Sequence, residues 1–168
     1  MPSEGEPRVL ILNPGDFAFG GQETLLQTLL GSCVAITFWH PGWRIGAMCH
    51  YMLPSRPPNR SGILSGRYAE EALEAIDDRF RALGLAPESI QTRMFGGANM
   101  FPGLTGKQPS IGDRNIEAGR SLLKSMGFAL TQEDLGGCLH RRVSFLVGTG
   151  RVEVQYGESG PKAAGGRR

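Results

Sequence analysis

The sequence predicts an α+β fold, because two β-hairpin patterns and two amphipathic helix patterns occur in one chain. The hairpin patterns cover residues 34–48 and 143–156, are rich in β-branched and aromatic residues, and are split by a Pro-Gly and a Gly-Thr-Gly turn. The helix patterns cover residues 68–83 and 114–126, where apolar side chains recur near helical spacing. Together with at least two further strands, these elements indicate an α+β domain.

The strands outside the hairpins follow from short local signals. Residues 9–12 are an apolar run of strand type that the Asn13-Pro-Gly15 turn closes. Residues 22–27 fit either an extended segment or one turn of helix. Residues 90–95 are typical of a strand, which runs into Gly96-Gly97.

Both expected helices carry an end signal. The helix over residues 68–83 is followed by Gly84, and its acidic residues lie toward its N-terminal half and its basic residues toward its C-terminal half. The helix over residues 114–126 is followed by Gly127 in the same way. Two helices of ordinary length are therefore predicted.

The first hairpin brings a cysteine and a histidine together. If the four-residue loop His40-Pro-Gly-Trp43 closes it symmetrically, Trp39 pairs with Arg44, and Cys33 then lies opposite His50. Directly opposed residues of an antiparallel pair hold their Cβ atoms about 4.5–5.5 Å apart. A thiol within reach of an imidazole base is the minimum apparatus of a cysteine nucleophile.

Alternation along the two strands divides their residues between two faces. One face is almost wholly apolar and is expected to be core, so Cys49 is interpreted as a packing residue. A one-residue slip in register would reverse this assignment. The face of Cys33 also carries Ala35, Thr37, Trp39, Arg44, Gly46, Met48 and His50, whereas Val34, Ile36, Phe38, Ile45, Ala47 and Tyr51 share the face of Cys49.

Length and composition bound the class of protein. The chain has 168 residues, a hydrophobic content of 40%, a charged content of 20% and a net charge of +2, which are typical of one domain, expected over residues 8–157. The polar, Gly- and Pro-rich ends, residues 1–7 and 158–168, are expected to be disordered. There is no basic stripe for nucleic acid, no apolar run of ~20 residues for membrane insertion and no secretory signal, so a cytoplasmic protein is expected.

Cys33 is the candidate nucleophile. It follows Gly31-Ser32, a small-residue turn that lets the backbone approach a substrate and directs N–H groups toward an oxyanion. Free cysteines are nevertheless more often buried small hydrophobes. Cys49 and His50 are adjacent and point to opposite faces, and no other metal spacing occurs, so no metal and no cofactor are expected. The Gly-rich segment Phe95–Phe101 lacks a phosphate-loop pattern and favours a tight turn.

Five motifs lie in one order within residues 9–156: LLGSCVAI (29–36), GAMCHYMLP (46–54), MFGGANMF (94–101), IGDRN (111–115) and DLGG (134–137). They resemble those of the chemoreceptor glutamine deamidases (CheD). The resemblance implies hydrolysis of the side-chain amide of selected glutamines on methyl-accepting chemotaxis receptors, which yields glutamate and ammonia. It also implies a β-sandwich-like core with helices packed outside, similar to the catalytic domain of cytotoxic necrotizing factor toxins. A further implied partner is the phosphatase CheC, in organisms that have one.

The same resemblance assigns roles to individual residues. The cysteine of the GSC motif is the nucleophile of the family and the histidine of the GAMxH motif is its partner, which correspond to Cys33 and His50. The third member is a threonine just before the cysteine motif, for which Thr28 is the nearest candidate. His140 is a departure, because the family usually has a small residue at this point, and it could lie on the surface or line a pocket.

These residues suit amide hydrolysis. Cys33 as thiolate, its proton taken by His50, would attack the amide carbon, and N–H groups around Gly31-Ser32 would stabilise the oxyanion. Thr28 would orient the imidazole or bind substrate. Two alternatives stay open: a cysteine-type methylesterase acting on glutamate esters of the same receptors, and a binding module that regulates a phosphatase or receptor. The intact Cys33/His50 pair speaks against a purely non-catalytic role.

Overall fold

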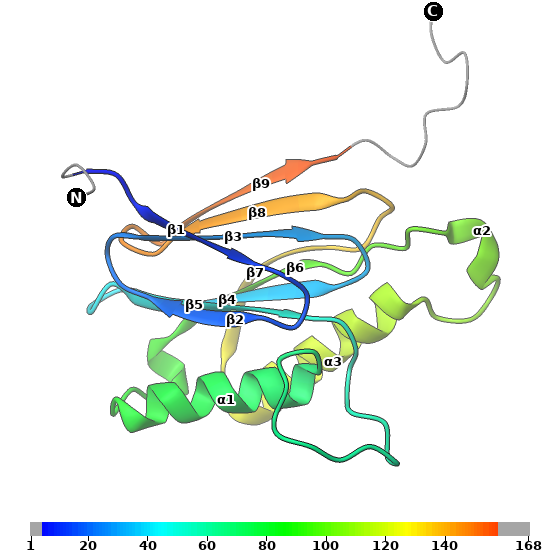
Figure 1. Cartoon of the computed structure of the whole chain (residues 1–168), viewed down its shortest axis with the longest axis horizontal. Helices are drawn as coiled ribbons and strands as arrows, with labels where there is room; N and C mark the ends of the chain where they lie inside the picture. Colours follow the sequence, from blue (N-terminus) through cyan, green and yellow to red (C-terminus); the bar gives the residue numbers. More distant parts are fainter. Residues whose placement is uncertain (1–4, 158–168) are drawn as a thin grey trace, which may run out of the picture.

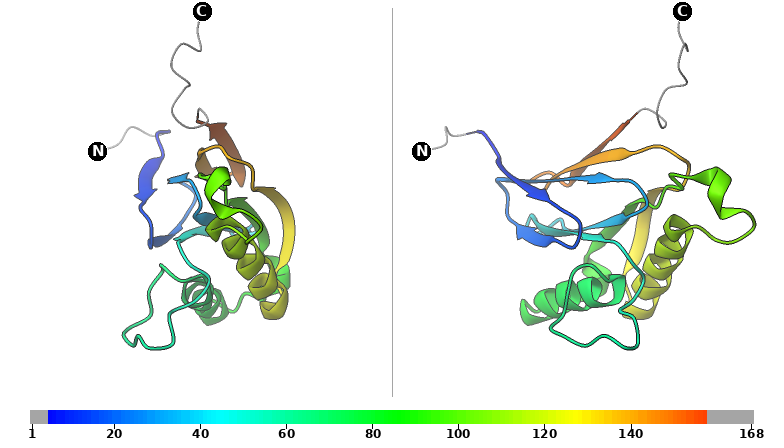
Figure 2. Two further views of the ribbon diagram at one scale, coloured as in Figure 1. Left: turned by 90° about the vertical axis from the view of Figure 1, so that its right-hand side faces the viewer. Right: turned by 45° about the vertical axis from the view of Figure 1, so that its right-hand side comes forward.

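The computed structural model describes residues 5–157, which form three layers: two β-sheets stacked face to face, and helices packed beneath the second sheet (Figures 1 and 2). Of the ends predicted to be disordered, residues 1–4 and 158–168 lie outside the described residues. The predicted α+β class, with a sandwich of sheets and helices outside it, is confirmed. A single domain over residues 8–157 stays a prediction.

The two sheets differ in size and connectivity. The outer sheet has the order β1-β3-β8-β9, formed by β1 (Arg8–Leu12), β3 (Thr24–Leu30), β8 (Arg141–Leu146) and β9 (Arg151–Tyr156). The central sheet has the order β2-β5-β4-β6-β7, formed by β2 (Phe17–Gly20), β5 (Ile45–Tyr51), β4 (Val34–His40), β6 (Gln91–Gly96) and β7 (Ala129–Leu135). The pairs β1–β3 and β6–β7 are parallel, and the remaining neighbours are antiparallel.

Helices α1 (Ala69–Ala82) and α3 (Ile111–Met126) cover the free face of the central sheet, while the short α2 (Pro102–Thr105) projects from one end of the molecule (Figure 1). A 3-10 turn, η1 (Pro87–Ser89), precedes β6. The longest helix, α3, begins three residues earlier than predicted because a capping box starts it: Ser110 accepts from the Asp113 N–H, and the Asp113 carboxylate accepts from the Ser110 N–H.

The central strands β4 and β5 are buried on both faces and contribute to two separate apolar cores. Ala35 and Met48 pack between the sheets, whereas Cys49 packs toward the helices and is fully buried. The two faces are those that alternation predicts, and Cys49 is a packing residue as expected. Because this hairpin belongs to both cores, its register determines which side chains reach each core.

The predicted pairing within this hairpin is wrong, because the loop starts and ends one residue later than expected. The loop consists of Pro41–Arg44 rather than His40–Trp43, with Arg44 at φ 54° closing the turn onto the His40 carbonyl. His40 therefore pairs with Ile45, and Ala35, not Cys33, lies opposite His50. Shifting the loop by one residue at both ends moves the register by two, so every side chain keeps its predicted face.

Two strands are absent from the sequence-based expectation. β2 and β7 form the edges of the central sheet, and their mixed burial hides the alternation that marks a half-buried strand. Residues 22–27, left open between strand and helix turn, belong mostly to β3. The remaining predicted strands and both predicted helices are present, with ends that differ by at most three residues.

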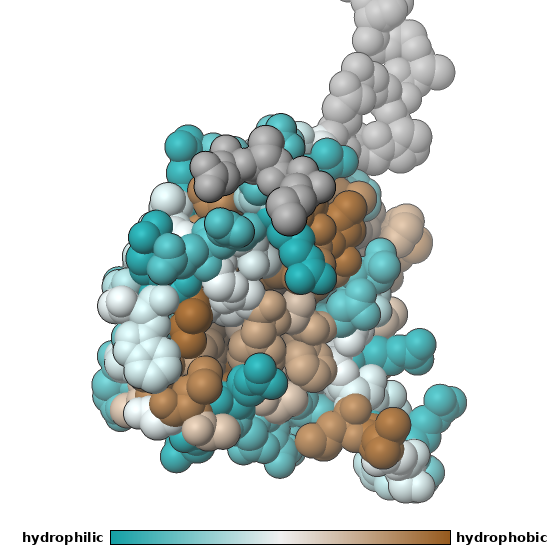
Figure 3. All heavy atoms as spheres, turned by 60° about the vertical axis from the view of Figure 1, so that its left-hand side comes forward, coloured by the Kyte–Doolittle hydropathy of each residue, from teal (hydrophilic) through white to brown (hydrophobic). Residues whose placement is uncertain are grey.

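The surface shown in Figure 3 carries several apolar patches separated by hydrophilic side chains. Two exposed apolar residues of the chain, Val9 and Ile11, lie on the edge strand β1. Within residues 5–157, no helix is long and apolar enough to cross a membrane.

Gly119 gives a test of the close packing between α3 and the central sheet. A Cβ at this position would collide with the Tyr51 hydroxyl and would lie 2.6 Å from the Met94 methyl carbon. Gly119→Ala should gain up to about 1 kcal/mol in helix propensity but lose about 1–3 kcal/mol by overpacking, so the melting temperature should fall. Gly103→Ala, with open space around the new methyl group, is the control. A Gly119→Ala chain as stable as the wild type would contradict this packing.

Candidate active site

The predicted nucleophile lies in a three-residue loop, Gly31–Cys33, between the end of β3 and the start of β4. All three carbonyl oxygens of this loop accept hydrogen bonds from the rest of the protein. Gly31 O accepts from the Ala98 N–H at 3.0 Å, and Cys33 O from the Gly97 N–H at 2.8 Å. Ser32 O accepts from the side-chain amide of Asn115 at 3.1 Å. In the part of the chain that the structure describes, the N–H groups of Ser32 and Cys33 donate to no acceptor, so they are available to a ligand.

The Gly-rich segment forms the expected turn and supplies two of these donors. Gly96 and Gly97 have φ values of 104° and 68°, which favour glycine. A Cβ at Gly112, in the first turn of α3, would lie 2.6 Å from the Ala98 carbonyl oxygen. The glycines of two motifs therefore permit the nucleophile loop, the 96–98 turn and the start of α3 to approach each other closely.

Cys33 is the half-buried cysteine of the three, since Cys49 is buried and Cys138 is exposed. Burial raises the pKa of the Cys33 thiol above its ordinary value. Burial also raises the pKa of Cys49 to about 12, so this thiol stays protonated and inert. Of the two, only Cys33 is accessible to solvent.

His50 lies on β5 and is 1% exposed. Its Nδ1 is 2.7 Å from Thr28 Oγ1, and this hydroxyl also donates to the Leu12 carbonyl at 2.8 Å. A hydroxyl has a single hydrogen. Because that hydrogen is given to Leu12, the Nδ1 of His50 must carry a proton and donate it to Thr28. This assignment leaves Nε2 as an unprotonated acceptor, and Nε2 is buried with no partner among the described residues.

The charge state of His50 follows from its surroundings. Burial lowers the pKa of His50 to about 4, although the negative charge of Asp16 acts in the opposite direction. The imidazole is therefore neutral near pH 7. A neutral imidazole with a fixed tautomer and a free Nε2 lone pair is a prepared proton acceptor.

The structure brings Thr28 and His50 into direct contact, and Cys33 lies in the loop that leads into β4. Ala35 is paired with His50, and Cys33 stands two residues before Ala35. The expected direct opposition of Cys33 and His50 is therefore corrected, because Ala35 occupies that place.

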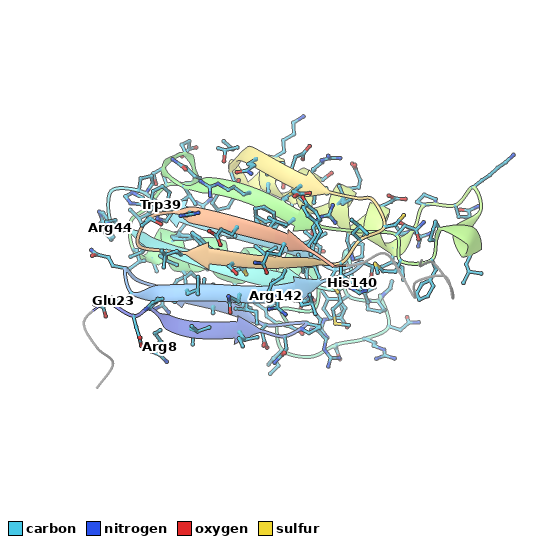
Figure 4. The ribbon with its side chains drawn as sticks, turned by 90° about the horizontal axis from the view of Figure 1, so that it is seen from above. Arg8, Glu23, Trp39, Arg44, His140 and Arg142 are labelled. Carbon is cyan, nitrogen blue, oxygen red and sulfur yellow. The ribbon has the colours of Figure 1, made fainter. Side chains whose placement is uncertain are left out.

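Two further residues, Met100 and His140, lie beside Gly31. A Cβ on Gly31 would be 3.4 Å from the Met100 side chain and 3.6 Å from His140 Cε1. His140 is exposed, and it lies toward the end of the outer sheet away from Arg44 and Trp39 (Figure 4). Beside Ser32 a small, mostly apolar cavity of about 160 Å³ opens. Its lining is Ser32, Ala98, Asn99, Met100, Phe101, Ser110, Ile111 and Gly112.

An ion pair joins the outer and the central sheet near His140. Arg141 of β8 is 5% exposed and donates to the Asp134 carboxylate at 3.2 Å. The Tyr156 hydroxyl donates to the same carboxylate, and the Arg141 guanidinium lies over the Tyr156 ring. The DLGG motif therefore contributes the carboxylate of a partly buried charge pair, which holds β7 of the central sheet against β8 and β9.

Sequence reasoning alone did not single out Thr28 or Asn115. Each is a polar residue at a buried position of an otherwise apolar face: Thr28 alternates with Leu26 and Leu30, and Asn115 adjoins Ile116 on the inner side of α3. A buried polar residue requires a hydrogen-bond partner, and that requirement is the signal that could have identified both. Across residues 5–157, no three His, Cys, Asp or Glu side chains are grouped so as to hold a metal ion.

The shifted pKa of His50 predicts a pH-dependent stability. The unfolded chain binds a proton at His50 near pH 6.5 and the folded chain only near pH 4. The free energy of unfolding should therefore fall as the pH drops from about 6.5 to 4, by on the order of 3 kcal/mol from this group. Urea unfolding at pH 7 and pH 4 should show a smaller loss in His50→Gln than in the wild type, with His140→Gln as the matched control. Equal losses in wild type and His50→Gln would contradict the assignment.

Comparison with known proteins agrees with the motifs. Residues 52–156 match the family model described as CheD chemotactic sensory transduction. A probable chemoreceptor glutamine deamidase CheD 3 from Dechloromonas aromatica is 50% identical over 149 residues, which cover 88% of this chain and 86% of that protein. A probable chemoreceptor glutamine deamidase CheD 1 from Chromobacterium violaceum is 40% identical over 94% of this chain and 82% of its own length. A probable chemoreceptor glutamine deamidase CheD from Pseudomonas savastanoi is 43% identical over 88% and 84%.

Among solved structures, the hypothetical protein YfiH of Bacillus licheniformis has a TM-score of 0.45 and 16% identity, over 79% of this chain and 59% of that one. The family model spans more than half of the chain, and the curated relatives span most of it. The chain therefore belongs to the CheD family.

Proposed function

We propose that this protein hydrolyses the side-chain amide of selected glutamines on methyl-accepting chemotaxis receptors, producing glutamate and ammonia. The single observation that carries the chemistry is the state of His50: Nδ1 is held by Thr28, and Nε2 is free on the strand face shared with Cys33. The names of the relatives, probable chemoreceptor glutamine deamidases, supply the substrate class.

The reaction begins from a neutral pair. Burial raises the pKa of Cys33 and lowers that of His50, so the resting site holds a thiol and an imidazole. Nε2 of His50 takes the thiol proton as the sulfur of Cys33 attacks the amide carbon. The Nδ1–H of the imidazolium that forms continues to donate its hydrogen bond to Thr28 Oγ1, and this bond prevents the ring from turning. The negative charge of Asp16 favours this cation.

The N–H groups of Ser32 and Cys33 then donate to the oxyanion of the tetrahedral intermediate. Their own carbonyls are held by Asn115 and Gly97, so the loop offers donors without needing to rearrange. The imidazolium gives its proton to the departing ammonia, which leaves a thioester on Cys33. His50 next activates water, and hydrolysis releases glutamate and restores the thiol.

The remaining expectations follow from the family resemblance. The substrate is the cytoplasmic helical region of the receptors, and the protein acts in the cytoplasm without membrane insertion, metal or cofactor. The phosphatase CheC is a regulatory partner where the organism has one. The sandwich is related to the catalytic domain of cytotoxic necrotizing factor toxins. Superposition on such a domain, and co-purification with CheC, are the direct tests of the last two points.

Peptide mass analysis after incubation with a receptor cytoplasmic fragment tests the activity. Deamidation adds about one mass unit per glutamine, ester hydrolysis removes the mass of a methylene group, and simple binding changes neither. Cys33→Ala should abolish the mass increase. Cys49→Ala removes a thiol that packs in the apolar core, and the folded variant should still produce the mass increase. Continued deamidation by Cys33→Ala would exclude the proposed mechanism.

Thr28 gives a second test, which separates orientation of the ring from packing. Thr28→Val keeps the shape but removes the acceptor of the Nδ1 proton, so kcat should fall roughly 100-fold. Thr28→Ser retains the hydroxyl and should recover most of the rate. If Val and Ser variants were equally active, the hydroxyl would have no role in catalysis.

A further inference from the structure

We propose that Asn115 is a positioning residue that fixes the nucleophile loop against the strand of His50. Asn115 is fully buried in α3, and its Nδ2 donates to Ser32 O at 3.1 Å and to Met52 O at 2.9 Å. Ser32 immediately precedes Cys33, and Met52 follows His50 by two residues. One side-chain amide therefore joins the segments that carry the two reacting groups.

The hydrogen bonds leave one orientation for this amide. Both partners are carbonyl oxygens, which only accept, so the NH₂ group must face them, and its two hydrogens match the two acceptors. Neither carbonyl belongs to a strand, since Ser32 precedes β4 and Met52 follows β5. The loop and the strand end thus obtain from Asn115 a connection that the sheet does not provide.

Asn115 is itself held rigidly. The Tyr51 hydroxyl donates to the Asn115 carbonyl at 2.6 Å, and the capping box of α3 begins five residues earlier, at Ser110. Gly112, in the same helical turn, lies against the Ala98 carbonyl. A group on such a fixed element can hold a neighbouring loop to within a fraction of an ångström.

A purely space-filling role does not account for this residue. The Oδ1 of Asn115 is buried and has no partner among the described residues. An unpaired buried acceptor is unfavourable, so an apolar side chain would fill the same space at less cost. An apolar side chain could not donate hydrogen bonds to the two carbonyls that Nδ2 holds.

Two variants test the proposal in a Cys138→Ser background, which removes the exposed thiol. Asn115→Ala deletes the clamp, and Asn115→Asp keeps its shape but sets acceptors against both carbonyls. The matched control is Thr92→Val, which removes another buried hydrogen bond to a backbone carbonyl, that of Ala129. Each chain is assayed for receptor deamidation and for the pH dependence of Cys33 alkylation by iodoacetamide.

For both Asn115 variants we expect a roughly 100-fold fall in kcat with KM nearly unchanged. The pH midpoint of Cys33 alkylation should fall by about half a unit or more toward the ordinary thiol value, because the freed loop is better hydrated. Thr92→Val should lose stability but keep both properties. A folded Asn115→Ala with wild-type kcat and an unchanged alkylation midpoint would overturn the proposal.

The kinetic part rests on the proposed function, whereas the alkylation midpoint does not. If the wild type deamidates no receptor, the proposed function fails, and the alkylation of Cys33 still decides the role of Asn115. A measurement on the unaltered side chain serves if the variants do not fold. The side-chain amide resonances of Asn115 should shift when Cys33 is alkylated, and resonances that stay in place would also overturn the inference.

Discussion

The site depends on a polar contact that crosses the apolar sandwich: the hydrogen bond between His50 on the central sheet and Thr28 on the outer sheet. A buried imidazole is unfavourable unless it is hydrogen-bonded. The two sheets must therefore stack in the one arrangement that satisfies it. Thr28 in turn donates to the Leu12 carbonyl on β1. Three strands from two sheets are fixed together by one hydroxyl, and the same hydroxyl determines the tautomer of the histidine.

A second constraint acts on the backbone beside this contact. The nucleophile loop has no sheet partner of its own, and its carbonyls are instead held by the 96–98 turn and by α3. That arrangement requires Gly97 to adopt a positive φ and Gly112 to lack a side chain. These glycines allow the 96–98 turn and the start of α3 to approach the loop closely enough to bond its carbonyls. The N–H groups of Ser32 and Cys33 are then backbone groups of the loop that have no partner among the described residues.

The sequence predicted the faces of the central hairpin but not its pairing. Alternation survives a register change of two, so Cys49 was assigned correctly to the core, while the opposition of Cys33 and His50 was wrong. The change arises at Arg44, whose positive φ closes the loop one residue later. No residue-type preference indicates that conformation for an arginine. Thr28 entered only through the family resemblance, because strand β3 was ambiguous and the partner of a buried hydroxyl is defined by tertiary contacts.

Burial favours the neutral form of both groups at the site, because it raises the pKa of the Cys33 thiol and lowers the pKa of the His50 imidazole. A resting thiolate would be more reactive, yet it would also be open to oxidation and to unselective attack. In the proposed mechanism, the neutral pair transfers its proton when a bound amide offers its carbon to the sulfur and its oxygen to the Ser32 and Cys33 N–H groups. Under that proposal, burial makes activation depend on the substrate, and the positions of loop and imidazole, rather than a permanent charge, set the reactivity of Cys33.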